Sequence, residues 1–231
     1  MGKHTVEKIG GTSMSQFGDV MKNIIIGKKT GKELYNRIFV VSAYGGITDL
    51  LLEHKKTGEP GVFAKFAAGD KSWISALDEV KSKMIQINTG FADLGLDLEK
   101  ANEFVNERIE GIRSCLKDLM KLRSFGHLRP VDYLPATREL LSAVGEAHSA
   151  YNSVLILQKR GINAIFVDLT GWKEEEVKSF DEEIRTAFKN IDYSNCLPIA
   201  TGYVKCLEGI MKTFDRGYSD ITFSKIAVIT G

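Results

Sequence analysis

The chain has 231 residues, 43% of them hydrophobic and 26% charged, as is ordinary for a globular protein with one large domain or two small ones. Its formal net charge is only +1, so no strong overall field favours binding to nucleic acid or to an anionic membrane. The longest unbroken apolar runs, such as residues 38–41, are far too short to span a bilayer.

Cysteine and histidine positions argue for a reducing compartment and against a protein-built metal cage. The three cysteines form no C-x-x-C pair and cannot all pair with one another. The four histidines lack metal-ligand spacing, so we predict no metal site in the protein itself and leave open a Mg²⁺ ion carried by a substrate. The N-terminus has no apolar signal region, and we therefore expect a cytoplasmic protein.

The first element is a short strand that ends in a glycine turn and leads into a helix. Gly10 and Gly11 would let the backbone approach a bound group closely. A helix N-terminus capped by Thr12 or Ser13 attracts anions, and Lys8 adds a positive charge. This stretch predicts a phosphate cradle, although a plain strand-to-helix turn fits the same residues.

A second strand and glycine turn follow the first helix. That helix is expected to run to about Ile26, with Gly27 as its stop. The basic connector at residues 28–36 lacks Walker spacing and is predicted to be a solvated loop. Residues 37–43 form the clearest strand, apolar enough for burial on both faces of a parallel sheet, and the glycine turn at residues 44–49 opens the next helix. Because ligands bind at the carboxyl ends of such strands, the two turns predict a site there.

Residues 57–123 differ in character and are expected to form a helical insert. They contain a predicted helix at 73–87 and another at 98–122, whose broad apolar stripe lies opposite charged residues. No chemistry is evident in this region. The stripe could pack inside the chain or against a second subunit, so a homodimer remains open.

The next long helix is predicted from Thr137 to about Lys159, after a proline-containing link at residues 125–136. Gly145 lies inside it, and a glycine costs about 1 kcal/mol in a helix interior. A glycine beside Glu146 in an apolar segment therefore suggests that another group approaches closely. The alternative is a plain helix contact with Glu146 exposed.

The remaining elements alternate between strands and helices. Strands are predicted at 162–167 and 197–204, with a helix opened by the capping-box pattern at Ser179 between them. This order predicts an α/β fold, a three-layer α/β/α sandwich with a mainly parallel sheet. Residues 221–230 are ambiguous, because their β-branched side chains favour a strand whereas a cap at Ser219 favours a helix.

Four motifs in this order resemble those of the aspartate kinases, whose catalytic domain has the amino acid kinase fold. They are Lys-x-Gly-Gly-Thr-Ser, Val-Val-Ser-Ala before a glycine loop and Thr, a helical Ser-x-x-Gly-Glu, and Arg-Gly-x-Ser-Asp. The resemblance covers nearly the whole chain. It implies transfer of the γ-phosphoryl group of ATP, with its Mg²⁺, to the side-chain carboxylate of L-aspartate. The product would be 4-phospho-L-aspartate, on the way to lysine, threonine and methionine.

The resemblance also implies roles for individual residues. Lys8 would neutralise the transferring phosphoryl group, and Asp220 would orient Lys8. Glu146 would hold the ammonium group of aspartate and Arg216 its α-carboxylate, a role that suits the guanidinium fork. The other implied contacts are Gly10, Gly11 and Ser13 with the nucleotide phosphates, and Ser42, Thr48 and Ser219 with aspartate and the reacting centre.

The chain departs from the family pattern at two positions and in length. Tyr218 replaces a glycine of Arg-Gly-Gly-Ser-Asp and could crowd that loop, and Asp215 could compete for Arg216. In the family, the rest of the nucleotide half and regulatory ACT modules follow. We therefore expect residues 1–231 to be the N-terminal part of a catalytic domain, a fragment that can be inactive by itself.

Two alternatives remain open. One is another kinase of the same fold, acting on glutamate or N-acetylglutamate, although the motifs at Lys8 and at residues 216–220 argue against it. The other is a non-catalytic fragment that binds an amino acid or a partner subunit. A Rossmann dehydrogenase is disfavoured, because no G-x-G-x-x-G follows a predicted strand.

Overall fold

The computed structural model describes residues 4–214 and 217–231. Within these ranges, four parallel strands form one sheet in the order β1-β2-β4-β3. The strands are β1 (Thr5–Ile9), β2 (Arg37–Val41), β3 (Ala164–Val167) and β4 (Leu197–Thr201). Ile9 is paired with Val41, and Val41 with Thr201, so β1, β2 and β4 end at one common edge of the sheet.

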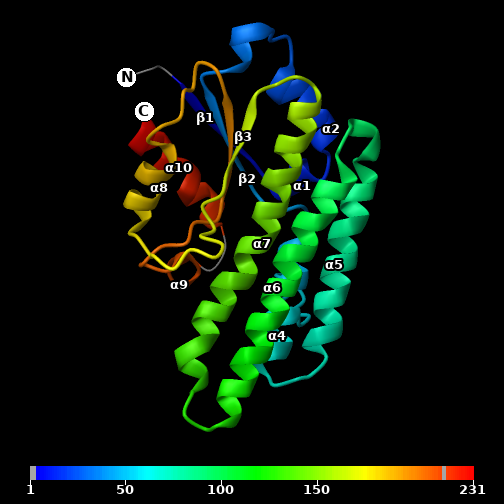
Figure 1. The fold of residues 1–231 in the computed structure, drawn as a ribbon, viewed down its shortest axis with the longest axis vertical. Helices are drawn as coiled ribbons and strands as arrows, with labels where there is room; N and C mark the ends of the chain where they lie inside the picture. Colours follow the sequence, from blue (N-terminus) through cyan, green and yellow to red (C-terminus); the bar gives the residue numbers. More distant parts are fainter. Residues whose placement is uncertain (1–3, 215–216) are drawn as a thin grey trace.

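Helices cover both faces of this sheet. They are α1 (Gly11–Met14), α2 (Phe17–Val20), α3 (Ile47–Leu51), α4 (Val62–Ala67), α5 (Trp73–Gly90), α6 (Leu98–Ser124), α7 (Pro130–Lys159), α8 (Phe180–Phe188), α9 (Ile210–Phe214) and α10 (Tyr218–Thr230). Helices α8 and α10 lie on one side of the sheet and α7 on the other (Figure 1). The buried residues of β2 and β4 are those expected of strands covered on both faces. The predicted three-layer sandwich is therefore confirmed.

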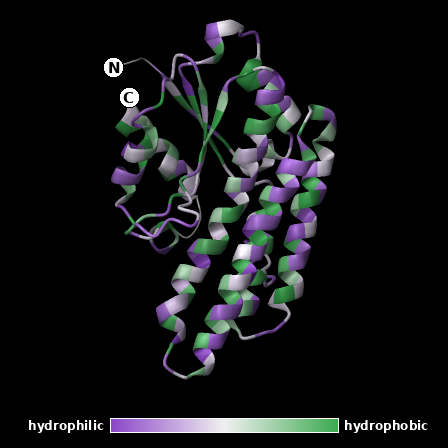
Figure 2. Cartoon of the chain, viewed as in Figure 1, coloured by the Kyte–Doolittle hydropathy of each residue, from purple (hydrophilic) through white to green (hydrophobic). Residues whose placement is uncertain are grey.

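The helical insert packs lengthwise against α7. Helices α5, α6 and α7 run side by side beyond the sheet (Figure 1), and hydrophobic and hydrophilic residues alternate along them (Figure 2). The apolar stripe of α6 is buried between α5 and α7 inside the chain. Among the described residues, no helix is both long and apolar enough to cross a bilayer.

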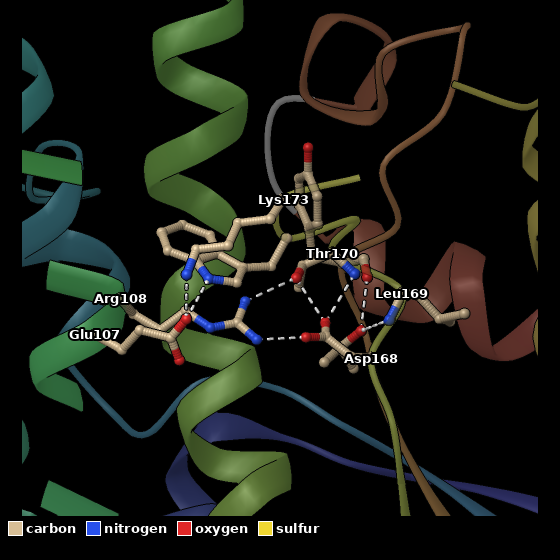
Figure 3. A network of polar contacts seen from close by, with 9 residues as sticks. Glu107, Arg108, Asp168, Leu169, Thr170 and Lys173 are labelled. Atoms are coloured by element: carbon tan, nitrogen blue, oxygen red, sulfur yellow. Dashed lines mark hydrogen bonds and ion pairs between the residues drawn. The ribbon is translucent and has the colours of Figure 1, made fainter. Parts of the chain in front are cut away.

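A buried arginine fastens the insert to the sheet. Arg108 of α6 is 5% exposed, and its guanidinium donates to Asp168 Oδ2 at 2.5 Å and to Thr170 Oγ1 at 3.1 Å (Figure 3). It also lies over the rings of Phe104 and Trp172. Asp168 directly follows β3, so this pair joins α6 to the carboxyl edge of the sheet.

Several predicted helix boundaries are wrong. Helix α7 begins at Pro130, not at Thr137, and Pro135 lies inside it. Proline suits the first helical position, and the hydrogen bond that Pro135 cannot donate would have gone to Val131, which is exposed to solvent. The predicted link at residues 125–136 is therefore mostly helix.

The N-terminal helix and the last helix also differ from expectation. The helix after the first glycine turn is interrupted, because α1 ends at Met14 and a π-helix, Met21–Ile26, follows α2. The N-cap of α1 is Gly10, and neither Thr12 nor Ser13 caps this helix with its side chain. The ambiguous stretch at residues 221–230 is helical and belongs to α10.

Helix α7 lies close to the end of β2 because residue 145 has no side chain. A Cβ on Gly145 would lie 2.8 Å from Ala43 Cβ and 3.1 Å from Ile47 Cγ2, so the close approach predicted at this glycine is confirmed. We expect Gly145→Ala to lower the free energy of unfolding by roughly 1–3 kcal/mol, because overpacking outweighs the gain in helix propensity. Urea unfolding measures the change.

The matched control is Gly90→Ala in α5, where no atom lies within 4 Å of an added Cβ. It should leave the stability unchanged or raise it slightly. Equal stabilities of the two variants would contradict the close contact at Gly145.

Candidate active site

The carboxyl ends of β1 and β2 border a cavity of about 560 Å³. Residues of α1, the loop after β2, α3, α7 and the start of α10 also line it. Its size is in the range of small-molecule sites. The cavity lies where ligands bind in open α/β sheets, and the two glycine turns of the sequence meet there.

A lysine and an aspartate form an ion pair at one side of the cavity. Lys8 lies near the end of β1, and Asp220 lies in the first turn of α10. Lys8 Nζ is 2.9 Å from Asp220 Oδ1. Helix α10 can start there because its N-cap, Gly217, has φ of 83°, a conformation that favours glycine. The pair holds the ammonium group in a fixed position within a solvent-accessible cavity.

A buried carboxylate lies deeper in the same cavity. Glu146 of α7 is 3% exposed, and its Oε1 accepts a hydrogen bond of 2.7 Å from Ser219 Oγ. Ser42 Oγ donates to Ser219 Oγ at 3.2 Å, and Ser149 Oγ of α7 donates to the Ser42 carbonyl at 2.8 Å. The three cavity residues Ser42, Glu146 and Ser219 are thereby joined, although they come from the β2 loop, α7 and α10.

The second oxygen of Glu146 has no hydrogen-bond partner among the described residues. Burial raises the pKa of Glu146 to about 8, against the lowering effects of the Ser219 hydroxyl, the nearby backbone N–H groups of Tyr203 and Ala43, and the Lys8 charge. In the ligand-free chain this side chain is therefore largely protonated at neutral pH. A buried carboxyl group with a spare oxygen beside a cavity is suited to pair with a cation brought by a ligand.

Ser219 has a different role from the predicted helix cap. Helix α10 begins at Tyr218, two residues before the start that a cap at Ser219 would give, and has no side-chain cap. The Ser219 hydroxyl instead bonds Glu146. A Cβ on Gly202 would lie 2.6 Å from Ser219 Cβ and 2.9 Å from Glu146 Oε2. Gly202, which is not among the predicted site residues, therefore makes room for this contact.

The first glycine turn packs directly on the second. A Cβ on Gly11 would lie 2.6 Å from the Ala43 carbonyl oxygen, so only glycine fits there. Ser15 joins the turns, because its Oγ accepts from the Gly45 N–H at 2.9 Å and donates to the Gly11 carbonyl. No local pattern points to Ser15, since its partner is 30 positions away.

Not all of the predicted site residues line the cavity, and one lies outside the residues that the structure describes. Thr48 lines the cavity, whereas Gly10 and Ser13 are not among its lining residues. Arg216 and Asp215 lie outside the described residues. Tyr218 is 4% exposed, and its ring packs edge-on against Tyr203 with centroids 5.9 Å apart. The side chain that replaces the family's glycine is therefore accommodated in the core.

A buried polar cluster that the sequence did not reveal lies behind the second glycine turn. His148 and Asn152 of α7 each contact Asn88 Oδ1 of α5, at 2.6 and 2.7 Å, and the Tyr44 ring lies edge-on against the imidazole. Burial lowers the pKa of His148 to about 3, so this histidine is neutral. The cluster connects the insert to Tyr44, which lines the cavity.

The fold and the site together define a class of protein. The model of the amino acid kinase family matches residues 3–231, and the chain belongs to that family. Within it, the chain is 52% identical to the aspartate kinase Ask_Ect of Stutzerimonas stutzeri, over 99% of this chain and 48% of that protein. It is 25% identical to the aspartokinase of Schizosaccharomyces pombe, over 96% of this chain and 43% of that protein. The chain thus spans about half the length of these curated relatives.

Solved structures share the fold. Aspartokinase III of E. coli in complex with aspartate and ADP (R-state) matches with a TM-score of 0.64 and 19% identity, over 98% of this chain and 47% of that one. The complex with lysine and aspartate (T-state) matches with a TM-score of 0.54 and 18% identity, over 87% and 41%. The predicted amino acid kinase fold is confirmed.

Proposed function

We propose that the chain carries the aspartate-binding and phosphoryl-transfer centre of an aspartate kinase. The reaction would move the γ-phosphoryl group of ATP to the side-chain carboxylate of L-aspartate and give 4-phospho-L-aspartate. The 52% identity to an aspartate kinase and the ligand-side geometry both support this proposal. These curated relatives are about twice as long as this chain, so the proposal concerns the activity of the whole protein.

The observation that carries the proposal is the spare, buried oxygen of Glu146 in the cavity that Lys8 borders. An amino acid substrate brings an ammonium group for Glu146, and its α-carboxylate needs a cation of its own. We propose Arg216 for that carboxylate, from its place in the sequence directly before Gly217. Ser42, Thr48 and Ser219 would then orient the side-chain carboxylate, which is the nucleophile.

The described residues also fit a phosphoryl group. Lys8 supplies a positive charge, and Gly11 and Thr12 at the start of α1 line the cavity. Asp220 would keep Lys8 in place. Phosphoryl transfer depends on such positioning and charge stabilisation, and no covalent protein intermediate is needed.

We propose that the metal ion of the reaction comes with the nucleotide. Among residues 4–214 and 217–231, no group of three or more His, Cys, Asp or Glu side chains is placed to hold one. Mg²⁺ is commonly bound through substrate phosphates and one or two carboxylates. Asp49 and Asp220 are carboxylates that line the cavity, and either would contact such an ion, which would neutralise phosphate charge.

Calorimetry with three ligands tests the proposal. We expect L-aspartate to bind, whereas N-acetyl-L-aspartate, which lacks the ammonium group, and L-glutamate should bind at least about tenfold more weakly. Formation of aspartyl hydroxamate from aspartate and Mg-ATP tests the transfer step. Equal affinity for aspartate and its N-acetyl derivative would contradict the role of Glu146, and tighter binding of glutamate would favour a different kinase of this family.

Aspartate affinity should increase with pH up to about 8. Glu146 has a raised pKa of about 8 in the free chain but must be ionised to pair with the ammonium group, so binding below that pH releases a proton. The affinity should rise close to tenfold per pH unit between about 6 and 7.5 and then level off. Titrations in buffers of different ionisation enthalpy measure the proton release; a pH-independent affinity in this range would contradict it.

A further inference from the structure

A short turn carrying two adjacent lysines lies at the rim of the cavity. Residues 53–60, here called the lysine turn, follow α3, and Lys55 and Lys56 both line the cavity. Both are exposed, and neither forms an ion pair with another described residue. Neither the four motifs nor the proposed transfer chemistry makes use of them.

The lysine turn is held firmly at its base. The backbones of Glu53 and Pro60 form an isolated antiparallel β-bridge across the turn. Arg138 of α7 donates to both carboxylate oxygens of Glu53, at 3.1 and 2.8 Å. A Cβ on Gly61 would lie 2.5 Å from the Leu50 carbonyl oxygen, so the chain folds back tightly on α3. The base of the turn is thus fixed to the two helices that border the site.

The tip of the lysine turn is ordered by a histidine. His54 Nδ1 accepts from the backbone N–H groups of Lys56 and Thr57, at 3.3 and 3.1 Å, and the Lys55 N–H donates to Asp49 Oδ1 at 3.3 Å. Positioning the backbone in this way reduces the ordering cost that a flexible loop would incur on binding a ligand. Lys55 and Lys56 therefore line the cavity from a preformed turn.

The cavity volume indicates a ligand larger than aspartate. Aspartate has nine heavy atoms and fills roughly 270 Å³ even at water's share of about 30 Å³ per heavy atom, whereas the cavity measures about 560 Å³. The Lys8 ammonium is already paired with Asp220. A chain of phosphates entering this space would meet the carboxylates of Asp49 and Asp220, so it needs further cations.

We propose that the lysine turn binds the phosphate chain of the nucleotide through Lys55 and Lys56. This inference rests on the proposed function, because it assigns the phosphate donor to the same cavity. It adds a phosphate contact outside both glycine turns. The ligand class is a polyphosphate, free or as part of a nucleoside triphosphate.

Calorimetry of residues 1–231 with inorganic tripolyphosphate tests the proposal. The variant Lys55→Gln/Lys56→Gln should bind tripolyphosphate about tenfold more weakly than wild type, and added salt should reduce the difference because exposed charges are screened. Lys55→Arg/Lys56→Arg should keep most of the affinity. A parallel titration with Mg-ATP shows whether a nucleotide uses the same lysines.

The matched control is Lys28→Gln/Lys29→Gln. This pair is also adjacent but lies in the connector before β2, away from the cavity-lining residues. It should change the affinity for tripolyphosphate less than twofold. Melting temperatures within about 2 °C of wild type would show that all variants fold.

Three results would overturn the proposal: no binding of tripolyphosphate by the wild type, unchanged binding by Lys55→Gln/Lys56→Gln, or an equal loss in the connector variant. Failure of the proposed function is distinguishable from these. If tripolyphosphate binding depends on the lysine turn but aspartate does not bind, the aspartate kinase proposal fails while the polyphosphate site stands. If aspartate binds but Lys55→Gln/Lys56→Gln leaves the affinity for tripolyphosphate unchanged, only this inference fails.

Discussion

Replacing Glu146 with Gln is expected to weaken aspartate binding by about 30-fold or more and, at the same time, to stabilise the chain. The loss of affinity follows because the substrate ammonium would lose its buried ionic partner, which typically costs about 2 kcal/mol or more. The gain in stability follows from burial, because the carboxyl group has a pKa of about 8 in the fold against an ordinary value of 4.5.

The direction of the stability effect depends on which state holds the proton. Between pH 4.5 and 8 the unfolded chain releases the proton of Glu146 while the folded chain retains it, so the free energy of unfolding falls as pH rises. Each pH unit costs about 1.4 kcal/mol, or roughly 3 kcal/mol by pH 7. Gln does not titrate, so the free energy of unfolding of Glu146→Gln should exceed that of wild type by that amount at neutral pH, which corresponds to about 6–12 °C in melting temperature.

The measurement is urea unfolding of both proteins from pH 4 to 8.5, together with aspartate calorimetry. The stability difference should vanish near pH 4.5 and reach its limit near pH 8. Glu103→Gln, on the exposed side of α6, is the control and should show neither effect. A stability difference that is constant with pH would mean that Glu146 is not the titrating group, and retained aspartate affinity would remove it from the binding site.

The strands could be predicted well because their signal is local. Residues 38–41 form a continuous apolar run, and β2 is buried at every position. The glycine turns could be predicted too, because adjacent glycines directly after an apolar strand are typical of a tight turn. The same local reasoning failed at α7, where prolines suggested a link but occupy the exposed first turns of a helix.

The assembly of the site could not be predicted from local pattern. Ser219 and Glu146 are 73 positions apart, so nothing near Ser219 reveals that its hydroxyl bonds a carboxylate rather than capping α10. Gly202 and Ser15 could not be predicted for the same reason, since their constraints come from other segments. Only the resemblance to a family predicted that residues far apart in the sequence belong to one site. The fold brings two of them, Lys8 and Asp220, into contact. Their catalytic roles stay predictions.

Lys8→Met is expected to reduce phosphoryl transfer about 10²–10³-fold, the loss typical of removing one charge-stabilising group from a transition state. Aspartyl hydroxamate formation at saturating aspartate and Mg-ATP measures it. Lys81→Met is a matched control, because Lys81 pairs with Glu110 at 3.0 Å and its side chain is 27% exposed, against 25% for Lys8, yet it lies on α5 away from the cavity. It should keep nearly full activity.

Lys8→Met should also weaken aspartate binding at pH 7, but not at pH 8.5. The positive charge of Lys8 lowers the pKa of Glu146, so removing that charge should raise this pKa further and leave Glu146 more protonated at pH 7. Aspartate affinity should then fall at pH 7 and recover as the pH is raised to 8.5, while phosphoryl transfer stays low at both. Recovery of transfer at high pH would mean that Lys8 acts only through Glu146, and an unchanged pH profile of aspartate binding would show that the two groups are not coupled.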